Sequence, residues 1–271
     1  MTDQLPIFVH IIADYGSTDD MAFAEVRQAI RYELRDKIAQ LESSSVKAFD
    51  TIATGFKLAQ LAINHRMGER QLFYVNTAPR KDDLKARGNN AGEGLAYAKL
   101  KNGVQIVAVN SGYSLSFIKE HALMLRHINC SAEGSQFRSR DVFPEAFGLI
   151  AHGDYSQLGA DILNDIPEMP KNVVCYTDGY GNLKTSVEAS LLDEMNGKKV
   201  AVTINGMTHE AHVGSGIFSV PEGELVLSAG SSGWQHTDGT KFRAAECVLR
   251  GGSAAAKFNL PKGGEEVKWQ A

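Results

Sequence analysis

The chain has 271 residues, of which 43% are hydrophobic and 22% are charged, and its net charge is −4. These values are ordinary for a soluble globular protein long enough for two domains, and they give no support for a nucleic-acid or membrane-surface partner. No run approaches the roughly 20 apolar residues of a membrane-spanning helix. The start of the chain lacks the features of a secretory signal, because Asp3 and Pro6 interrupt it.

The cysteines and histidines indicate a cytoplasmic protein without a metal site. Cys130, Cys175 and Cys247 are odd in number and far apart, and no Cys-x-x-Cys pair occurs. Such usage is typical of reduced packing residues. His209 and His212 lie three apart in a predicted strand, so we expect them to face opposite sides rather than share a metal.

The first informative stretch joins a predicted strand to a predicted helix. Residues 5–12 are mostly apolar and β-branched, which is typical of a strand buried on both faces. The turn after them carries Asp14, Asp19 and Asp20. Ligands bind just beyond the carboxyl ends of strands in open α/β sheets, so Asp14 is the first candidate binding residue. The helix face that follows consists of Met21, Phe23, Val26, Ile30 and Leu34.

Helix capping is the alternative explanation for part of this turn. Ser17 is predicted to cap the helix, with Asp20 three residues later completing a weak capping box. Asp19 would then favour the positive end of the helix. Both explanations stay open for Asp19 and Asp20, whereas capping does not account for Asp14.

The chain continues as alternating strands and helices up to about residue 160. We expect residues 38–41 either to prolong the first helix or to form a short strand, and Ser43–Ser45 to end regular structure. Residues 77–102 are polar and rich in glycine, which predicts a long loop. The other predicted elements are a helix over 52–65 after Phe49, a strand over 71–75 ending at Asn76, a strand over 103–109, and a helix over 142–152 with Pro144 in its first turn.

Pro167 and Pro170 mark the predicted domain boundary, which gives domains of residues 1–166 and 167–271. We expect the first to be an α/β domain with a mostly parallel sheet. The second contains short alternating stretches separated by glycine turns, which predicts a small antiparallel β-barrel or sandwich. Its candidate strands are residues 173–176, 199–204, 224–228, 244–250 and 265–269.

The order of several short motifs resembles the S-adenosyl-L-methionine (SAM) hydroxide adenosyltransferases and their fluorinase and chlorinase relatives. A β-turn alone would explain Asp178-Gly-Tyr-Gly-Asn182, but the stretch is also similar to the family's Asp-x-Phe-Gly-Asn signature. The other matching stretches are Asp14-Tyr-Gly-Ser-Thr-Asp19-Asp20, Phe137-Arg-Ser-Arg-Asp-Val-Phe143, Phe218-Ser-Val-Pro-Glu-Gly223, Ser231-Ser-Gly-Trp234 and Arg250-Gly-Gly-Ser-Ala254.

This resemblance implies an adenosyl ligand and the residues that hold it. Asp14 would accept both ribose hydroxyls, Asp178 and Asp19 would pair with the ammonium, and Ser231 would hold the carboxylate. Asn182 and the backbone of Gly252 would contact adenine. Phe49 and Phe218 would pack on the nucleoside, where core packing is the alternative. Tyr180 and Trp234 are further binding candidates within the matched motifs.

The resemblance implies a reaction whose usual residues are not intact here. Family members displace methionine from C5′ of SAM with water or halide, and the hydrolytic ones use an Asp, an Arg and a His. Asn76 occupies the Asp position and Arg138 the His position, while Arg80 or Arg87 is the candidate for the Arg. Neither Asn76 nor Arg138 serves as a base at neutral pH.

The same comparison argues against a halogenase. Ser139 aligns with a serine that the fluorinase uses near its halide, but Pro79 stands where a hydroxyl residue would be expected. The candidate catalytic residues are therefore Asn76, Arg138, Ser139 and Arg80.

Three hypotheses about the function remain open at this point. The first is an enzyme that hydrolyses SAM to adenosine and methionine. The second is a SAM or nucleoside binder without catalysis, and the third is an enzyme that uses another adenosyl compound or nucleophile. The resemblance also implies a homotrimer with sites between subunits, and SAM as substrate or ligand with no further cofactor.

Overall fold

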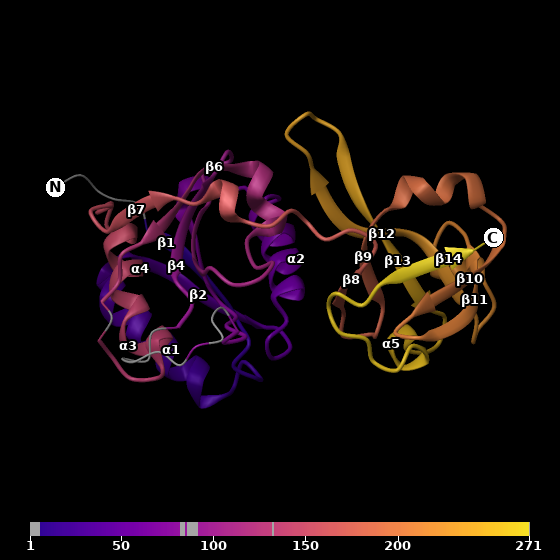
Figure 1. The fold of residues 1–271 in the computed structure, drawn as a ribbon, viewed down its shortest axis with the longest axis horizontal. Helices are drawn as coiled ribbons and strands as arrows, with labels where there is room; N and C mark the ends of the chain where they lie inside the picture. The colour runs from indigo at the N-terminus through magenta and orange to yellow at the C-terminus, as the bar shows by residue number, and fades with distance from the viewer. Residues whose placement is uncertain (1–5, 82–84, 86–91, 132, 271) are drawn as a thin grey trace. The chain divides into compact units, whose positions relative to one another are not determined.

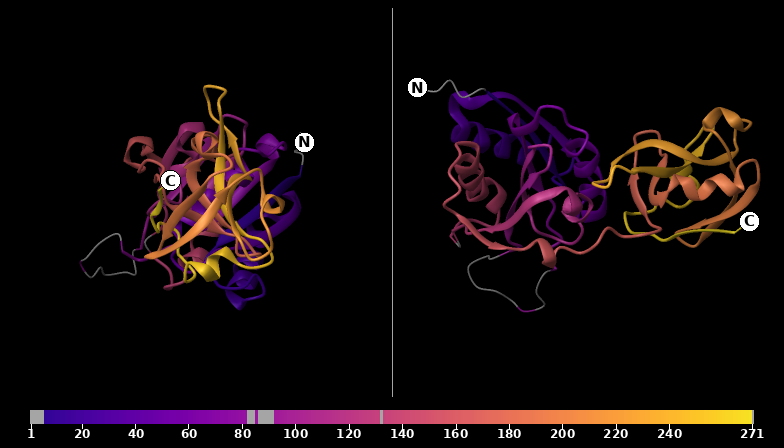
Figure 2. Two further views of the ribbon diagram at one scale, coloured as in Figure 1. Left: turned by 90° about the vertical axis from the view of Figure 1, so that its right-hand side faces the viewer. Right: turned by 90° about the horizontal axis from the view of Figure 1, so that it is seen from above.

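The structure is a computed structural model that describes residues 6–81, 85, 92–131 and 133–270. The chain divides into two units, Met1–Glu168 and Met169–Ala271, each with its own sheet (Figures 1 and 2). Within the described residues, no helix has the length and apolar character that crossing a membrane requires.

The first unit is built on a seven-stranded mixed sheet in the order β2-β1-β3-β5-β4-β6-β7. The pairs β1–β2, β1–β3 and β3–β5 are parallel, and β4, β6 and β7 complete the sheet with antiparallel pairs. The strands are β1 (Ile7–Ala13), β2 (Ile38–Ser45), β3 (Gln71–Asn76), β4 (Leu95–Leu100), β5 (Gln105–Val109), β6 (Ala122–Ile128) and β7 (Leu158–Asp161).

Helices cover both faces of this sheet. The first helix, α1 (Met21–Leu34), packs with α4 (Phe143–Ala151) into one apolar cluster against the sheet, and α3 (Arg138–Asp141) is a short turn leading into α4. On the other side of the sheet, α2 (Thr51–Ala62) contacts the 3-10 segment η3 (Ser116–His121), partly through the rings of Phe56 and Phe117 (Figure 1). The remaining 3-10 segments of this unit are η1 (Arg35–Lys37), η2 (Gly68–Arg70) and η4 (Leu163–Asp165).

The start of α1 corrects two expectations. Asp20, not Ser17, is the N-cap, because its carboxylate accepts the Ala22 backbone N–H at 2.9 Å. The predicted apolar face is buried from Phe23 onward, but Met21 is 74% exposed. Met21 is the first residue of the helix and lies outside the buried stripe.

Three further expectations for this unit were wrong in part. Residues 38–45 form β2, so Ser43–Ser45 continue a strand instead of ending regular structure. The polar Ser44 is compatible with this strand, since its hydroxyl hydrogen-bonds His10 Nε2 on β1 at 2.8 Å. The predicted loop 77–102 contains β4, and the sequence analysis also missed β6 and β7. These strands pair with partners distant in the chain, which local patterns do not reveal.

The second unit is one curled, mostly antiparallel seven-stranded sheet in the order β14-β10-β11-β12-β13-β9-β8. Only β11 and β12 are parallel among these pairs. The predicted fold class, an α/β domain followed by a small β domain, is confirmed. The elements are β8 (Val174–Thr177), β9 (Leu183–Glu188), η5 (Ala189–Met195), β10 (Lys199–Ile204), β11 (Met207–Val213), η6 (Ile217–Ser219), β12 (Leu225–Gln235), β13 (Lys241–Leu249), α5 (Ala254–Lys257) and β14 (Val267–Gln270).

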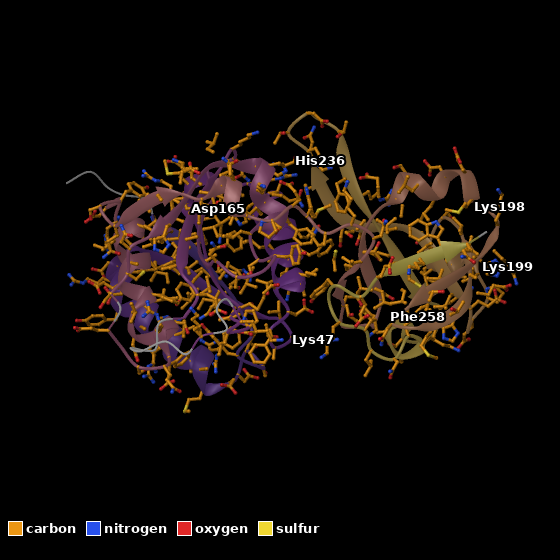
Figure 3. The ribbon with its side chains drawn as sticks, in the orientation of Figure 1. Lys47, Asp165, Lys198, Lys199, His236 and Phe258 are labelled. Carbon is orange, nitrogen blue, oxygen red and sulfur yellow. The ribbon has the colours of Figure 1, made fainter. Side chains whose placement is uncertain are left out.

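The side chains of both units fill the interiors beneath these elements (Figure 3). Phe147 provides a test of the first core. Its side chain is fully buried and packs edge-on against Tyr74, with 5.4 Å between ring centroids. We expect Phe147→Ala to lower the free energy of unfolding by about 3–5 kcal/mol in chemical denaturation. Tyr32→Ala, at a position 75% exposed on α1, should change it by less than about 0.5 kcal/mol. Equal effects of the two variants would contradict this packing.

Candidate functional site

The candidate site of the first unit lies at the sheet edge where parallel strands end. Asp14 follows β1, and Asn76 is the last residue of β3, paired with Ala13. The chain leaves β1 to build β2 on one side and then crosses to build β3 on the other. The carboxyl ends of the strands at such a reversal of strand order are the usual ligand position in this class of sheet.

Asp14 is held at this edge by backbone contacts. Its Oδ2 accepts the Phe49 N–H at 2.8 Å, and its own N–H donates to the Asn76 carbonyl at 3.2 Å. Burial raises the pKa of Asp14, partly offset by the Phe49 N–H bond to its carboxylate and by the nearby Arg80 cation. Within the part of the chain that the structure describes, Asp14 forms no ion pair. A half-buried carboxylate of this kind is suited to accept hydroxyl donors from a ligand.

Phe49 and Arg80 flank Asp14 in unusual backbone conformations. Phe49 has φ of 65° and a ring that is 57% exposed, and Arg80 has φ of 59°. The Arg80 N–H donates to the buried Glu93 carboxylate at 2.5 Å, which ties the segment after β3 to the start of β4. The other candidate arginine, Arg87, lies outside the described residues.

Asn76 belongs to a neutral polar cluster with Tyr15 and Ser139. The Asn76 Nδ2 donates to the Tyr15 hydroxyl at 2.7 Å, and the Ser139 side chain lies close enough to that hydroxyl to lower its pKa, which opposes part of the effect of burial. The Tyr74 hydroxyl donates to the Ser139 carbonyl at 2.6 Å. Burial raises the pKa of Tyr15 well above its ordinary value, so its hydroxyl stays protonated. The structure therefore brings Asn76 and Ser139 together, and it adds Tyr15, which the sequence analysis had placed only within a motif.

Arg138 and Asp19 make different contacts. The Arg138 Nη2 donates to the Ser131 carbonyl at 3.1 Å, and its guanidinium lies 5.2 Å from the Phe143 ring centroid. Asp19 is exposed, and its N–H meets the Ser17 hydroxyl at 3.4 Å. Among the contacts of the described residues, none joins either side chain to Asn76.

In the second unit, Asp178 organises the turn between β8 and β9. Its Oδ1 accepts the N–H groups of Tyr180 and Asn182 at 3.0 Å, and its Oδ2 accepts the Asn182 side-chain amide at 3.0 Å. Lys184 Nζ lies 3.7 Å from Asp178 and 2.5 Å from Glu246. The β-turn interpretation therefore describes the local role of Asp178 in this structure. Lys184 and Glu246 are charged neighbours that the sequence analysis did not select.

Contacts join three of the predicted C-terminal motifs. The Ala255 N–H donates to the Gly181 carbonyl at 2.8 Å, so the segment after residue 250 lies against the Asp178 turn. The Arg250 guanidinium lies 5.6 Å from the Phe218 ring centroid and donates to the Val220 carbonyl at 2.6 Å. Tyr180 and Phe218 are 82% and 83% exposed. This surface therefore offers two aromatic rings beside ordered turns.

The remaining predicted residues of this unit have separate surroundings. Trp234 is 2% exposed and stacks obliquely on Phe242, with 4.7 Å between centroids, so its ring belongs to the core. Ser231 is exposed within the irregular part of β12, between residues 229 and 233. The Gly252 N–H donates to the Leu249 carbonyl at 3.2 Å.

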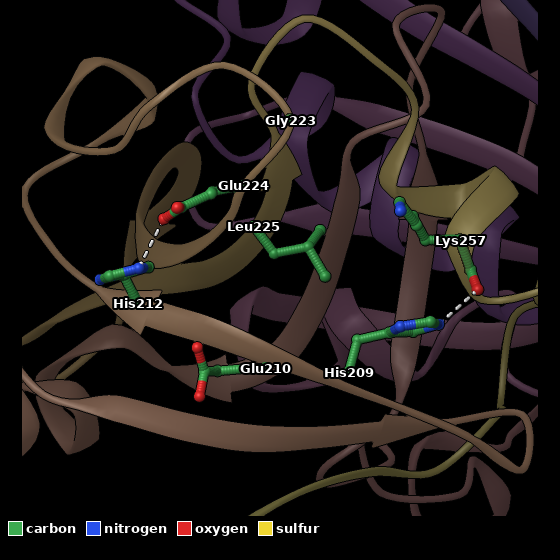
Figure 4. A pocket seen from close by; sticks show the side chains of 7 residues that line it. All are labelled: His209, Glu210, His212, Gly223, Glu224, Leu225 and Lys257. Carbon is green, nitrogen blue, oxygen red and sulfur yellow. Dashed lines mark hydrogen bonds and ion pairs between the residues drawn. The ribbon is translucent and has the colours of Figure 1, made fainter.

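A pocket of about 190 Å³ lies elsewhere on the second unit (Figure 4). His209 Nε2 meets the Lys257 carbonyl at 2.9 Å, while His212 Nε2 meets the Glu224 carboxylate at 2.6 Å. The two histidines are on β11 and have different partners, and no cluster of the described residues groups three side chains that could hold a metal. The lining residues are His209, Glu210, His212, Gly223, Glu224, Leu225 and Lys257, none of them a predicted site residue.

Comparison with known proteins identifies the type of the second unit. Residues 172–267 match the family model described as SAM hydroxide adenosyltransferase C-terminal domain. A conserved protein from Thermotoga maritima has the same fold, with a TM-score of 0.72, 19% identity, and alignment over 97% of this chain and 100% of that one. A conserved protein from Thermus thermophilus gives a TM-score of 0.67 and 17% identity, over 98% of this chain and 100% of that one. No curated protein gives a significant match.

Gly181 tests the contact between the two C-terminal motifs. It has φ of 82°, and a Cβ there would overlap the Ser253 hydroxyl, whereas Gly197 has φ of 80° and open space around it. Both Ala variants incur a backbone cost of about 1 kcal/mol. We expect Gly181→Ala to lower the free energy of unfolding further, by about 1–3 kcal/mol beyond Gly197→Ala. Equal values in denaturant titrations would refute close approach of the motifs.

Asp14 should stabilise the fold more as a neutral side chain than as a charged one. Its pKa in the folded state is raised by burial, so ionisation disfavours folding at neutral pH. We expect Asp14→Asn to raise the unfolding temperature at pH 7, by less than about 1 kcal/mol in free energy because solvent still screens the group. The gain should vanish well below pH 3.8, where both side chains are neutral.

Asp19→Asn removes the same charge from an exposed neighbour and serves as the control for this experiment. A thermal gain for Asp14→Asn that persists at low pH would argue against a buried-charge origin.

Proposed function

We propose that the protein binds SAM and displaces methionine from its C5′ carbon with water, because residues 172–267 match the family model described as SAM hydroxide adenosyltransferase C-terminal domain. The observation that carries the proposal is Asp14. This carboxylate follows β1 at the reversal of strand order, and Phe49 N–H holds one of its oxygens. Burial has already removed part of the water around the Asp14 carboxylate. Two ribose hydroxyls would donate hydrogen bonds to it in place of that water.

The exposed groups of the second unit supply the other ligand contacts in this proposal. Phe218 and Tyr180 pack on the nucleoside and on the sulfonium, since aromatic faces attract cations. Asn182 and the Gly252 backbone contact adenine. Asp178 keeps its turn contacts and, with Asp19, pairs with the ammonium, while Ser231 holds the carboxylate. Trp234 supports this surface from the core.

The proposed reaction needs no covalent intermediate. The water oxygen forms a bond to C5′, the bond from C5′ to sulfur breaks, and its electron pair returns to sulfur as methionine leaves. The water gives up its proton to solvent as adenosine forms. Catalysis would come from holding water in line and removing its other hydrogen-bond partners. Asn76 and Ser139 are the proposed water contacts, and Arg80 and Arg138 the proposed cationic groups nearby.

We further propose a cytoplasmic homotrimer in which one ligand is held by the first unit of one subunit and the second unit of a neighbour. The family resemblance implies this arrangement. A reducing compartment is supported by the absence of a disulfide among Cys130, Cys175 and Cys247, all of which the structure describes.

A second candidate function is SAM or nucleoside binding without turnover. Two observations favour it: the strand β3 ends in an amide, Asn76, and Arg138 is engaged by the Ser131 carbonyl. A third candidate is substitution at C5′ by another anion, or on another adenosyl compound, with Arg80, Arg87 or Arg138 as anion contacts.

Incubating the purified protein with SAM and following adenosine by chromatography tests the proposal. We expect adenosine and methionine in equal amounts from the unaltered chain. Asp14→Ala removes charge-assisted hydrogen bonds to the ribose and should lower kcat/KM by about 10- to 100-fold. Asp36→Ala, on the exposed η1 segment, is the matched control and should retain full activity.

The other outcomes separate the remaining candidates. Tight SAM binding in calorimetry with no product after long incubation would favour the second function. Product formation that depends on an added anion, or on another adenosyl compound, would favour the third.

A further inference from the structure

We propose that Tyr15 is a positioning residue that holds the Asn76 amide so that its oxygen is presented to the ligand site. This inference rests on the proposed function for its kinetic consequence. Tyr15 would contact Asn76 and not the attacking water, so its effect on the reaction would be indirect.

The Tyr15 ring is itself firmly placed. It packs edge-on against Phe23 of α1, with 5.1 Å between centroids, and against Phe137 before α3, with 5.7 Å between centroids. The Tyr15 ring, one residue after Asp14, is therefore packed between two parts of the chain. A side chain packed on both sides has few alternative rotamers, so its hydroxyl is a fixed reference point.

The hydroxyl of Tyr15 sets the orientation of Asn76. It accepts the Asn76 Nδ2 at 2.7 Å. Asn76 is only 6% exposed, and a flipped amide would place its oxygen, not its nitrogen, on Tyr15. With the nitrogen engaged, the oxygen is the end of the amide that remains to accept a hydrogen bond.

An amide oxygen at this point would orient water without taking its proton. It accepts one O–H of the water and leaves a lone pair of the water oxygen for attack on C5′. This is positioning rather than general base catalysis. The Tyr15 hydroxyl thereby holds in place the amide that stands where the family has an acid.

A double-mutant cycle with Tyr15→Phe and Asn76→Ala tests this inference. Tyr15→Phe keeps both ring contacts and removes only the hydroxyl. We expect its kcat for adenosine formation to fall about 10- to 100-fold, with KM for SAM changed less than about threefold. In the Asn76→Ala background the same change should have no further effect, because Tyr15 acts through Asn76. Tyr97→Phe is the matched control, since it removes another buried hydroxyl, bonded to Gln105 at 2.8 Å.

A second measurement reads the hydrogen bond independently of turnover. Exchange of the Asn76 side-chain amide protons with solvent, followed by NMR, should be slow in the unaltered chain and in Tyr97→Phe. It should be fast in Tyr15→Phe. Phe137→Leu removes one of the two rings packed against Tyr15 and should give an intermediate exchange rate, which keeps the test valid if Tyr15→Phe does not fold.

The outcomes are distinct. Adenosine formation with additive losses in the cycle, or unchanged amide exchange in Tyr15→Phe, overturns the role of Tyr15 while the proposed function stands. No adenosine from the unaltered chain overturns the proposed function and the kinetic part of this inference. The amide exchange then still decides whether Tyr15 holds Asn76.

Discussion

The parallel pairing of β1 with β3 is the constraint on which the first unit depends. It places Ala13 beside Asn76, so the residues that follow the two strands leave the sheet at one edge. Because β2 and β3 lie on opposite sides of β1, the connection that follows β1 and the one that follows β2 run in opposite directions along the sheet. A shift of this register by one residue would turn Asn76 to the opposite face of the sheet. The polar groups at this edge therefore share a single structural cause.

Charge is distributed differently in the two units. At the edge of the first sheet, the half-buried Asp14 carboxylate has the Arg80 and Glu93 charges nearby, and Asn76, Tyr15 and Ser139 add neutral polar groups. In the second unit Lys184 lies between Asp178 and Glu246 and neutralises one of their two negative charges. A buried charge is costly unless an opposite charge or hydrogen bonds compensate it. The Asp14 carboxylate is compensated instead by the Phe49 N–H and by the Arg80 charge, which leaves it capacity to accept further hydrogen bonds.

The sequence predicted the elements whose signal is local. The strand before Asp14, the buried face of α1 and the strand ending at Asn76 follow from apolar spacing alone. The strand β2 was ambiguous because its polar residues, such as Ser44, are explained only by their neighbours on β1. The same limitation hid β4 within a glycine-rich stretch, because its partner β5 supplies the pairing.

The candidate site was predictable only where one residue type suggests one chemistry. Asp14 was selected because capping does not explain it, and the structure places it at the sheet edge. Tyr15 was not selected, because a tyrosine in a turn carries no signal until its hydroxyl is seen on Asn76. The buried partner of Arg80, Glu93, is likewise separated from it by a stretch without periodicity.

The backbone of Phe49 has a consequence for how a ligand would arrive. A bulky residue at φ of 65° is strained by about 1–3 kcal/mol, and its N–H bond to Asp14 opposes relaxation of that strain. The connection between β2 and α2 therefore adopts its conformation during folding, and Phe49 is exposed to solvent in that conformation. Association with a planar molecule would then freeze little additional motion in this segment, so more of the contact energy would remain as affinity.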